Sequence, residues 1–268
     1  MSSTTKKPFS SQKEVQKPSL WLLLLESRAV VELGMYAINY PFLRAEQKGD
    51  GHPVMVIPGF MTDDITTIPL RHYLKKMGYA VHAWGLGRNM GNPEIDWRLI
   101  KRVKQLKSRY GKNVSLIGWS LGGVYAREIA RIIPEDVRQV ITLGSPFMKL
   151  TEKNNAIWLH EAIYGKKVNT INSELLRRMT EPLPVPTTAI FSKSDGVVPW
   201  EYCIEPFEDA VSQNIEVASS HCGLGHHPVT LICIADRLAQ AENDWKPFKV
   251  EGAKTVSYTH LTLPTSVI

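Results

Sequence analysis

The stretch that most constrains the fold of this chain runs from residue 114 to residue 133. It opens with a short apolar run, which is typical of a buried strand, and it closes with a segment of helical spacing that stops at Pro134. Between the two lies Gly-Trp-Ser-Leu-Gly at residues 118–122, whose glycines leave room for a sharp turn because they have no Cβ atom. Ser120 is therefore predicted to lie in a strained strand-to-helix turn, with its hydroxyl projecting above a sheet.

Strand and helix patterns alternate along the rest of the chain, which indicates an α/β fold with a mostly parallel sheet and helices on both faces. One domain is expected over residues 50–248, with a short helical cap inserted at about residues 147–186. The expected strands are 53–58, 79–84, 114–117, 137–143, 187–191 and 215–218. The expected helices of this domain, apart from the cap, are 66–77, 93–111, 124–133 and 228–241.

A serine hydroxyl is a poor nucleophile unless a base takes its proton and a third group orients that base. Asp195 comes just after the expected strand 187–191, and His221 comes just after the expected strand 215–218. The carboxyl ends of parallel strands meet at one edge of the sheet, which is where such sheets bind ligands. The order Ser, Asp, His, each after its own strand, therefore predicts a catalytic triad of Ser120, Asp195 and His221.

A triad of this kind also needs two preset hydrogen-bond donors for the oxyanion of the transition state. The backbone N–H of Leu121 is one candidate, because it opens the helix that follows Ser120. The loop at residues 58–61 can supply the second donor, from the backbone N–H of Phe60.

Four segments of the chain resemble the α/β-hydrolase family, in particular small bacterial lipases and esterases and the lipase-like inositol-deacylase group. They are Val-Ile-Pro-Gly-Phe at 56–60, Gly-Trp-Ser-Leu-Gly-Gly at 118–123, Ser-Asp-Gly-Val-Val-Pro at 194–199 and His-Cys-Gly-Leu at 221–224. The resemblance covers roughly residues 50–241. It implies hydrolysis of carboxylic esters through an acyl-enzyme, with no metal and no cofactor. It also implies a minimal six-stranded sheet, since no strand precedes Pro53.

The chain departs from the family pattern at two positions. Pro58 stands where many lipases carry a histidine, and Trp119 replaces the common histidine or tyrosine beside the nucleophile. Phe60, Met61 and Trp119 favour a substrate with an apolar acyl group, either a small-molecule ester or a lipid ester. Two other functions stay open: an acyltransferase that uses the same triad, and a binding module without catalytic activity.

Several assignments have competitors in the sequence. His226 and His227 compete with His221 for the role of base, although they stand at the entry to the last helix, where a capping role is simpler. Asp195 could merely cap the turn at Gly196.

The cysteines leave another question open. Cys203 and Cys222 follow late strands, so a bridge between them is an alternative to two reduced thiols.

Composition excludes few functions. The chain is 43% hydrophobic and 22% charged, as in ordinary globular proteins, and its net charge is +6. Part of that charge lies on the basic helix at 98–112, which is expected to be a solvated helix face, with attraction to an anionic membrane as the alternative. No nucleic-acid-binding motif is present, so no nucleic-acid partner is expected. The three cysteines lack metal-ligand spacing, and the oligomeric state stays open.

The two ends of the chain differ from the domain between them. Residues 1–17 are polar and are expected to be disordered, and residues 1–16 lack the apolar core of a secretory signal, which favours a cytoplasmic location. Residues 18–43 are expected to form an amphipathic helix that packs on the domain, or that makes a peripheral contact with a membrane. Residues 256–268 resemble translated read-through of a sequencing adapter and are expected to be a non-native tail.

Overall fold

The computed structural model describes residues 15–43, 48–92, 96–148, 178–206, 208–209, 211–246 and 248. The predicted tail at 256–268 lies outside this part of the chain, as do most of the polar N-terminus and most of the predicted cap.

Six parallel strands form one sheet, in the order β2-β1-β3-β4-β5-β6, which confirms the predicted fold class. The register pairs Trp119 with Leu143 and Phe191 with Glu216, so the loops after the strands meet at one edge of the sheet. The strands are β1 Pro53–Ile57, β2 Ala80–Ala83, β3 Val114–Trp119, β4 Val137–Leu143, β5 Thr187–Phe191 and β6 Ser212–Glu216.

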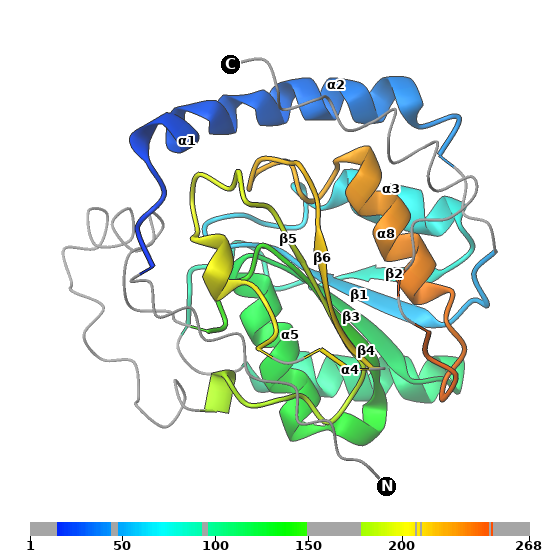
Figure 1. Cartoon of the computed structure of the whole chain (residues 1–268). Coiled ribbons are helices and arrows are strands. Elements are labelled where there is room, and N and C mark those ends of the chain that lie inside the picture. Colours follow the sequence, from blue (N-terminus) through cyan, green and yellow to red (C-terminus); the bar gives the residue numbers. More distant parts are fainter. Residues whose placement is uncertain are drawn as a thin grey trace, which may run out of the picture.

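Helices cover both faces of this sheet (Figure 1). The apolar side chains of α3 and α8 pack on one face, in a core cluster that includes Leu70 and Ile234. Those of α4 and α5 pack on the other face, in a cluster that includes Val103 and Ile129. The helices and 3₁₀ turns are α1 Leu20–Leu25, η1 Glu26–Arg28, α2 Ala29–Asn39, α3 Ile68–Lys76, α4 Trp97–Tyr110, α5 Leu121–Ile132, η2 Pro134–Asp136, η3 Trp200–Tyr202 and α8 Pro228–Leu238.

Several predicted boundaries were wrong, and local hydrogen bonds explain two of them. Strand β6 spans residues 212–216 rather than 215–218, because the ladder with β5 begins at the pair Thr187 and Ser212, ahead of the apolar run that marked the strand in the sequence. Helix α4 begins at Trp97 rather than near residue 93, because the Asp96 side chain accepts a hydrogen bond from the Arg98 backbone N–H and so caps the helix there.

The N-terminal helical segment, defined as residues 20–39 and formed by α1, η1 and α2, buries acidic side chains and exposes apolar ones. It crosses above the edge of the sheet at which the strands end (Figure 1). Its buried residues are two acids, Glu26 and Glu32, while none of its exposed residues, all of which the structure describes, bears a charge. The exposed large side chains of this segment are Leu20, Trp21, Leu24, Leu25, Val30, Val31, Leu33 and Ile38. The segment therefore turns its polar face to the domain, the reverse of an ordinary surface helix.

Candidate active site

The turn between β3 and α5 has the strained geometry that its glycines predict. Ser120 has a φ of 53°, a left-handed conformation that costs a non-glycine residue free energy. Its backbone N–H donates to the Leu143 carbonyl oxygen at 2.8 Å, which ties the turn to β4. A Cβ atom at Gly118 would overlap the backbone of Gly123, and one at Gly122 would lie 2.7 Å from the Pro58 carbonyl oxygen. Only glycines at these two positions allow strand and helix to approach so closely.

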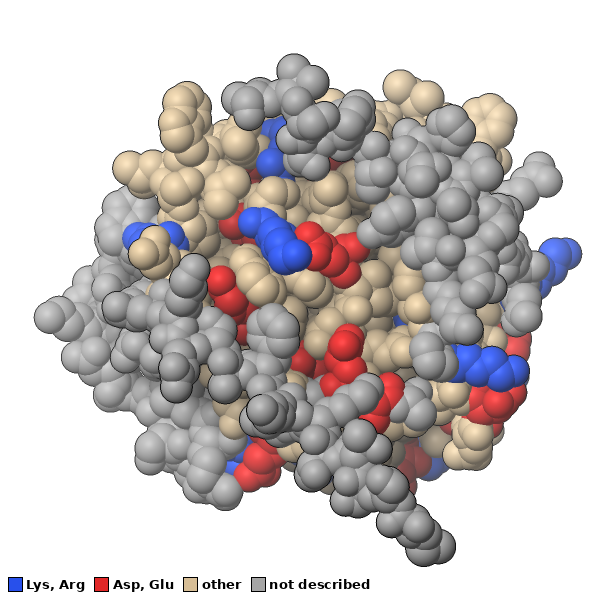
Figure 2. Space-filling model, in the orientation of Figure 1, with Lys and Arg blue, Asp and Glu red and all other residues tan. Residues whose placement is uncertain are grey.

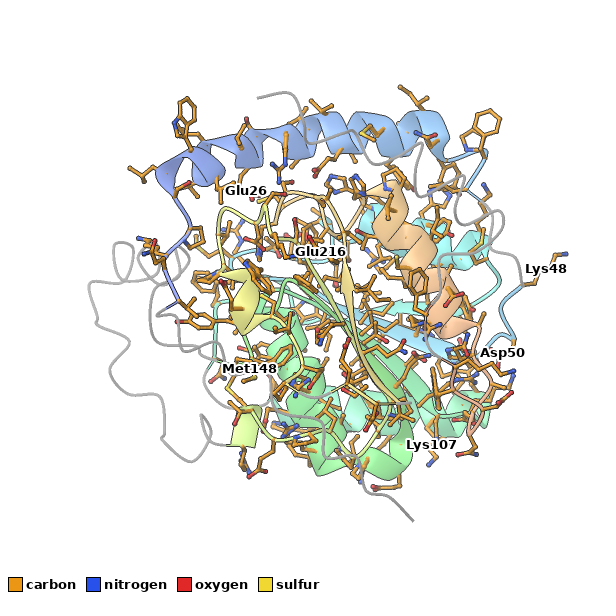
Figure 3. All side chains as sticks on the ribbon, in the orientation of Figure 1. Glu26, Lys48, Asp50, Lys107, Met148 and Glu216 are labelled. Carbon is orange, nitrogen blue, oxygen red and sulfur yellow. The ribbon has the colours of Figure 1, made fainter. Side chains whose placement is uncertain are left out.

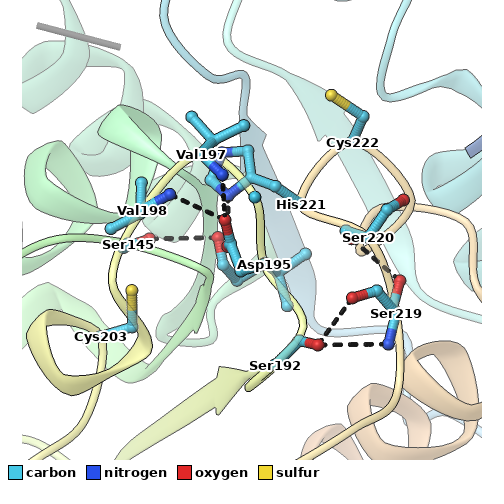
Figure 4. A network of polar contacts seen from close by, with 12 residues as sticks. Ser145, Ser192, Asp195, Val197, Val198, Cys203, Ser219, Ser220, His221 and Cys222 are labelled. Carbon is cyan, nitrogen blue, oxygen red and sulfur yellow. Dashed lines mark hydrogen bonds and ion pairs between the residues drawn. The ribbon is translucent and has the colours of Figure 1, made fainter. Parts of the chain in front are cut away.

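Asp195 and His221 form a buried pair at the same edge of the sheet (Figure 4). The carboxylate Oδ2 of Asp195 lies 2.6 Å from Nδ1 of His221. The other oxygen, Oδ1, accepts hydrogen bonds from the backbone N–H groups of Val197 and Val198, both at 2.8 Å. Asp195 therefore caps its own turn with one oxygen and contacts the imidazole with the other.

The charge around His221 favours the protonated imidazole. Burial lowers the pKa of His221, but the charge and the hydrogen bond of Asp195, with a further contribution from the Glu26 carboxylate, outweigh it. The net result is a pKa above the usual value of 6.5. An imidazole with a raised pKa takes up a proton readily, and its protonated form is stabilised.

Ser120 lies at the edge of the sheet that carries the Asp195–His221 pair. Within the described part of the chain, no hydrogen bond joins its hydroxyl to His221. Gly144, after β4, packs against the Asp195–His221 pair. A Cβ atom there would lie 3.1 Å from Nδ1 of His221 and 3.2 Å from Oδ2 of Asp195. The three predicted triad residues thus follow strands β3, β5 and β6 of one sheet, and their catalytic roles stay predictions.

The two residues predicted to supply the oxyanion donors have neighbouring side chains. Leu121 is the first residue of α5, and the side chains of Leu121 and Phe60 both lie within 4 Å of a Cβ atom placed at Gly91. Met61 has a φ of 59°, and its backbone N–H donates to the Asn89 carbonyl oxygen at 2.7 Å. This bond fixes the loop that carries Phe60 beside the nucleophile.

Trp119, predicted to contact substrate, is buried. Its Nε1 donates to the His221 carbonyl oxygen at 3.0 Å, and its ring lies against Gly225. The indole therefore links the turn at Ser120 to the loop that carries His221. A contact with substrate stays a prediction.

The competing residues have other partners. Nε2 of His226 lies 3.0 Å from the Ala29 carbonyl oxygen, and burial lowers the pKa of this histidine. His227 is buried at the start of α8 without a side-chain capping bond. Cys203 and Cys222 are free, so no bridge joins their loops, and Figure 4 shows them on opposite sides of the Asp195–His221 pair.

A second hydrogen-bonded arrangement of serine, histidine and acid lies at the other end of β1 and β3, and sequence analysis missed it. Nδ1 of His52 lies 2.5 Å from Oδ1 of Asp50, and its Nε2 lies 2.8 Å from the Ser115 hydroxyl. Ser115 and His52 are both 0% exposed, and burial, followed by the charge of Arg138, lowers the pKa of His52 to about 4. No substrate reaches these groups, so the chain of hydrogen bonds joins the starts of the two strands.

Sequence analysis also missed two functional candidates, Glu26 and Glu32 of the N-terminal helical segment. Both are buried against the loops of Asp195 and His221. The available signal was the presence of acids at helical spacing inside an apolar run.

Other kinds of site have no support in the described ranges. These residues hold no group of three or more histidine, cysteine or acidic side chains placed to bind a metal ion. None of their helices has both the length and the apolar character needed to cross a bilayer. Figure 2 shows basic and acidic side chains interspersed over one face, rather than gathered into a single large patch.

Comparison with known proteins finds partial sequence matches to esterases and structural likeness to lipases. No family model matches the chain. Over 104 residues, 37% of this chain and 39% of the relative, it is 27% identical to the pimeloyl-[acyl-carrier protein] methyl ester esterase of Aliivibrio fischeri strain MJ11. The esterase of the same name from Shewanella woodyi is 30% identical over 103 residues, 38% of this chain and 40% of the relative. The match therefore spans about two-fifths of the length of these curated relatives.

Solved structures extend the likeness to most of the chain. Lipase B of Aspergillus fumigatus superposes with a TM-score of 0.60 at 18% identity, over 80% of this chain and 58% of the lipase. The mature lipase of Bacillus licheniformis superposes with a TM-score of 0.53 at 17% identity, over 72% of this chain and 95% of the lipase. Together with the six-stranded parallel sheet and the strained turn at Ser120, these likenesses show that the chain has the α/β-hydrolase fold.

Proposed function

We propose that this protein is a serine hydrolase that cleaves carboxylic esters through an acyl-enzyme. The observation that carries the proposal is the strained turn at Ser120, at the same sheet edge as the buried Asp195–His221 pair. Strain of this kind persists only where the surrounding structure enforces it, and it is concentrated at functional sites. The relatives named as esterases and lipases support the same chemistry.

The reaction begins when the hydroxyl oxygen of Ser120 attacks the ester carbonyl carbon. His221 takes the hydroxyl proton on Nε2, while Asp195 accepts the hydrogen bond of Nδ1–H and so holds the required tautomer. The N–H groups of Leu121 and Phe60 stabilise the oxyanion of the tetrahedral intermediate. His221 then gives its proton to the leaving alcohol oxygen, and the carbon–oxygen bond to the alcohol breaks.

The second half of the reaction regenerates the enzyme. Water attacks the acyl-enzyme carbonyl, and His221 takes a proton from the water. When the bond to Ser120 breaks, that proton returns to the serine oxygen and the carboxylic acid leaves. An acyltransferase would follow the same steps with an acceptor alcohol or amine in place of water.

An ester with an apolar acyl group suits the residues around this site. Phe60 and Met61 lie in the loop that packs beside the nucleophile, and a Cβ atom at Gly59 would lie 3.2 Å from the Ser120 Cβ. The curated relatives are named for a pimeloyl-[acyl-carrier protein] methyl ester, and a pimeloyl group contains an apolar methylene chain. A series of p-nitrophenyl esters of increasing chain length, assayed for kcat/KM, tests this preference.

Labelling with a fluorophosphonate probe tests the proposal directly. The wild-type protein should be labelled and should hydrolyse p-nitrophenyl esters, and Ser120→Ala should lose both properties while keeping its melting temperature. Ser115→Ala is the matched control, because it removes the other serine that is hydrogen-bonded to a histidine, and it should keep labelling. An unlabelled wild-type protein would favour the inactive binding module. Labelling with hydrolysis slower than transfer to an added alcohol would favour the acyltransferase.

A further inference from the structure

The N-terminal helical segment holds the His221 loop through Glu26. Oε1 of this carboxylate accepts the backbone N–H of His221 at 2.9 Å, and Oε2 accepts the backbone N–H of Cys222 at 2.9 Å. Oε1 also accepts the backbone N–H of Gly196 at 2.8 Å, in the turn that carries Asp195. Glu26 is buried on the inner side of the segment (Figure 3). One carboxylate thus joins the loops of two predicted triad residues.

Glu32, further along the same segment, makes a second set of bonds. Its carboxylate accepts the backbone N–H of Ser220 at 2.9 Å, the Ser220 hydroxyl at 2.6 Å and the Ser219 hydroxyl at 3.3 Å. Between the two acids, Arg28 donates to the carbonyl and hydroxyl oxygens of Ser194, both at 2.8 Å. The segment therefore contacts the residues on either side of the Asp195–His221 pair.

Two glycines make this close approach sterically feasible. A Cβ atom at Gly196 would overlap the Leu22 carbonyl, and one at Gly223 would overlap the Glu32 carboxylate. Gly196 follows Asp195 directly and Gly223 comes two residues after His221. Both glycines belong to the motifs that identified the triad, and both leave room for the N-terminal helical segment.

We propose that Glu26 and Glu32 are positioning residues of the triad, which fix the loops of Asp195 and His221 from outside the hydrolase domain. A carboxylate suits this role because it only accepts hydrogen bonds, and the two loops present backbone N–H groups and hydroxyls. The role rests on the proposed function, since it concerns the geometry of the same Asp195 and His221. The negative charge of Glu26 adds a second effect, because it favours protonation of His221.

Glu26→Gln changes both the hydrogen bonds and the charge, and each change has its own readout. The glutamine keeps one acceptor oxygen but places an amide donor where Oε2 accepted a backbone N–H, and it removes the charge. Misplacement of a catalytic group by about 1 Å costs roughly 100-fold in rate, so kcat should fall on that order, with little change in KM. The acidic limb of kcat/KM should move to lower pH, because a charge that raises the pKa of His221 is gone.

Assigning the shift of the acidic limb to Glu26 requires an account of the charged and titratable groups around the His221 imidazole. Asp195 faces it from the loop after β5, Glu26 faces it from the N-terminal helical segment, and Cys222 is its neighbour in its own loop. Glu216→Gln is the control, because it neutralises an exposed acid at the end of β6 that pairs with Lys193, and it should leave kcat and the pH profile unchanged.

Titration of the His221 imidazole by NMR, in a Ser120→Ala background, tests the proposal without turnover. The His221 pKa should fall in Glu26→Gln and stay unchanged in Glu216→Gln, whether or not the protein proves to be an esterase. Should Glu26→Gln fail to fold, Glu32→Gln provides the second variant, with a fall in kcat per fluorophosphonate-labelled site. An unchanged His221 pKa together with unchanged kcat in the folded variants overturns the proposal. Absence of wild-type labelling overturns the proposed function instead.

The outer face of the same segment carries a second inference, from a separate observation. Trp21 is 74% exposed, Ile38 is 73% exposed, and Phe42, just beyond the segment, is 78% exposed. The segment spans 20 residues, or about 30 Å of helix, along which the exposed side chains are apolar or small. Such an apolar row without charges is costly in water and suits a flat apolar partner.

We infer that this face docks on an anionic lipid surface. Four lysines, Lys6, Lys7, Lys13 and Lys17, precede the segment in the sequence, against one acid, Glu14. Basic residues next to an apolar helix face are attracted to anionic headgroups, which a protein partner does not supply in general. Because the segment lies above the sheet edge that carries Ser120, docking would bring lipid esters to that edge (Figure 1).

Co-sedimentation with vesicles tests the inference. The full chain should bind phosphatidylcholine vesicles that contain phosphatidylglycerol, and bind neutral phosphatidylcholine vesicles at least tenfold more weakly. Leu24→Ser combined with Ile38→Ser should lose binding at least tenfold, without a change in kcat on a water-soluble ester. Ile132→Ser, which removes an exposed side chain at the last residue of α5, should keep binding. The inference is overturned by a failure to bind anionic vesicles, or by a stable dimer that the double variant abolishes in their absence.

Discussion

Asp195→Asn should stop catalysis while leaving the fold in place. In the wild-type protein, Oδ1 of Asp195 accepts two backbone N–H groups and Oδ2 faces Nδ1 of His221 at 2.6 Å. Asparagine keeps one acceptor oxygen, and the two N–H groups of Val197 and Val198 require it. The amide nitrogen of the new side chain must then face the imidazole.

This orientation forces the wrong tautomer on His221. An amide N–H that points at Nδ1 requires Nδ1 to accept, so the imidazole proton moves to Nε2, which can no longer take the proton of Ser120. The equivalent substitution in a serine protease lowers kcat about 10⁴-fold. A loss of that order corresponds to about 5.5 kcal/mol of transition-state stabilisation. Removal of the carboxylate also lowers the pKa of His221, which adds to the loss of imidazolium stabilisation.

The assay is kcat/KM with a p-nitrophenyl ester, beside the melting temperature of both proteins. Asp244→Asn is the matched control, since it neutralises an exposed acid far along the chain. Asp195→Asn should lose about four orders of magnitude, and the control should lose none. A loss of less than about tenfold, in a variant with the wild-type melting temperature, would refute the assignment of Asp195 as the group that orients His221.

Three further predictions follow from the geometry. The raised pKa of His221 places the acidic limb of kcat/KM above pH 6.5. Protonated His221 also stabilises the fold below pH 6.5, and this contribution to stability is lost as pH rises through the folded-state pKa. Melting temperatures measured across this pH range would detect the loss. Gly122→Ala should lower the free energy of unfolding by about 1–3 kcal/mol, because its Cβ would meet the Pro58 carbonyl oxygen at 2.7 Å, and urea denaturation measures this loss. Deletion of residues 256–268 should leave the melting temperature and esterase activity unchanged, and a lower melting temperature on truncation would show that these residues belong to the fold.

The sheet and the candidate triad could be predicted from the sequence because their determinants are local. The glycines at 118 and 122 are required by backbone contacts within the turn itself. Asp195 and His221 each follow a recognisable strand, and parallel strands bring their carboxyl ends to one edge regardless of sequence details.

The orientation of the N-terminal helical segment could not be predicted in the same way. Its apolar residues dominate the sequence, and the usual rule buries them. Here the partners of the buried acids are backbone N–H groups of residues 196 and 221, which are 170 and 195 positions away from Glu26. Backbone donors leave no trace in a side-chain pattern, so the sequence shows the two acids but not the partners that bury them.

The two arrangements of serine, histidine and acid, one at Ser115 and one at Ser120, differ in the features on which catalysis by such a set of residues depends. Hydrogen-bond geometry alone favours the arrangement at Ser115, because the Ser115 hydroxyl lies 2.8 Å from Nε2 of His52, whereas the Ser120 hydroxyl forms no hydrogen bond with His221. The two arrangements differ in access and in backbone strain: Ser115 is fully buried within a regular strand, while Ser120 is 9% exposed with a φ of 53°. They differ also in the electrostatics of the imidazole, since the pKa of His52 is lowered and that of His221 is raised. A catalytic base must take a proton from a serine that a substrate can reach, so the greater exposure of Ser120 and the raised pKa of His221 favour this arrangement as the candidate site.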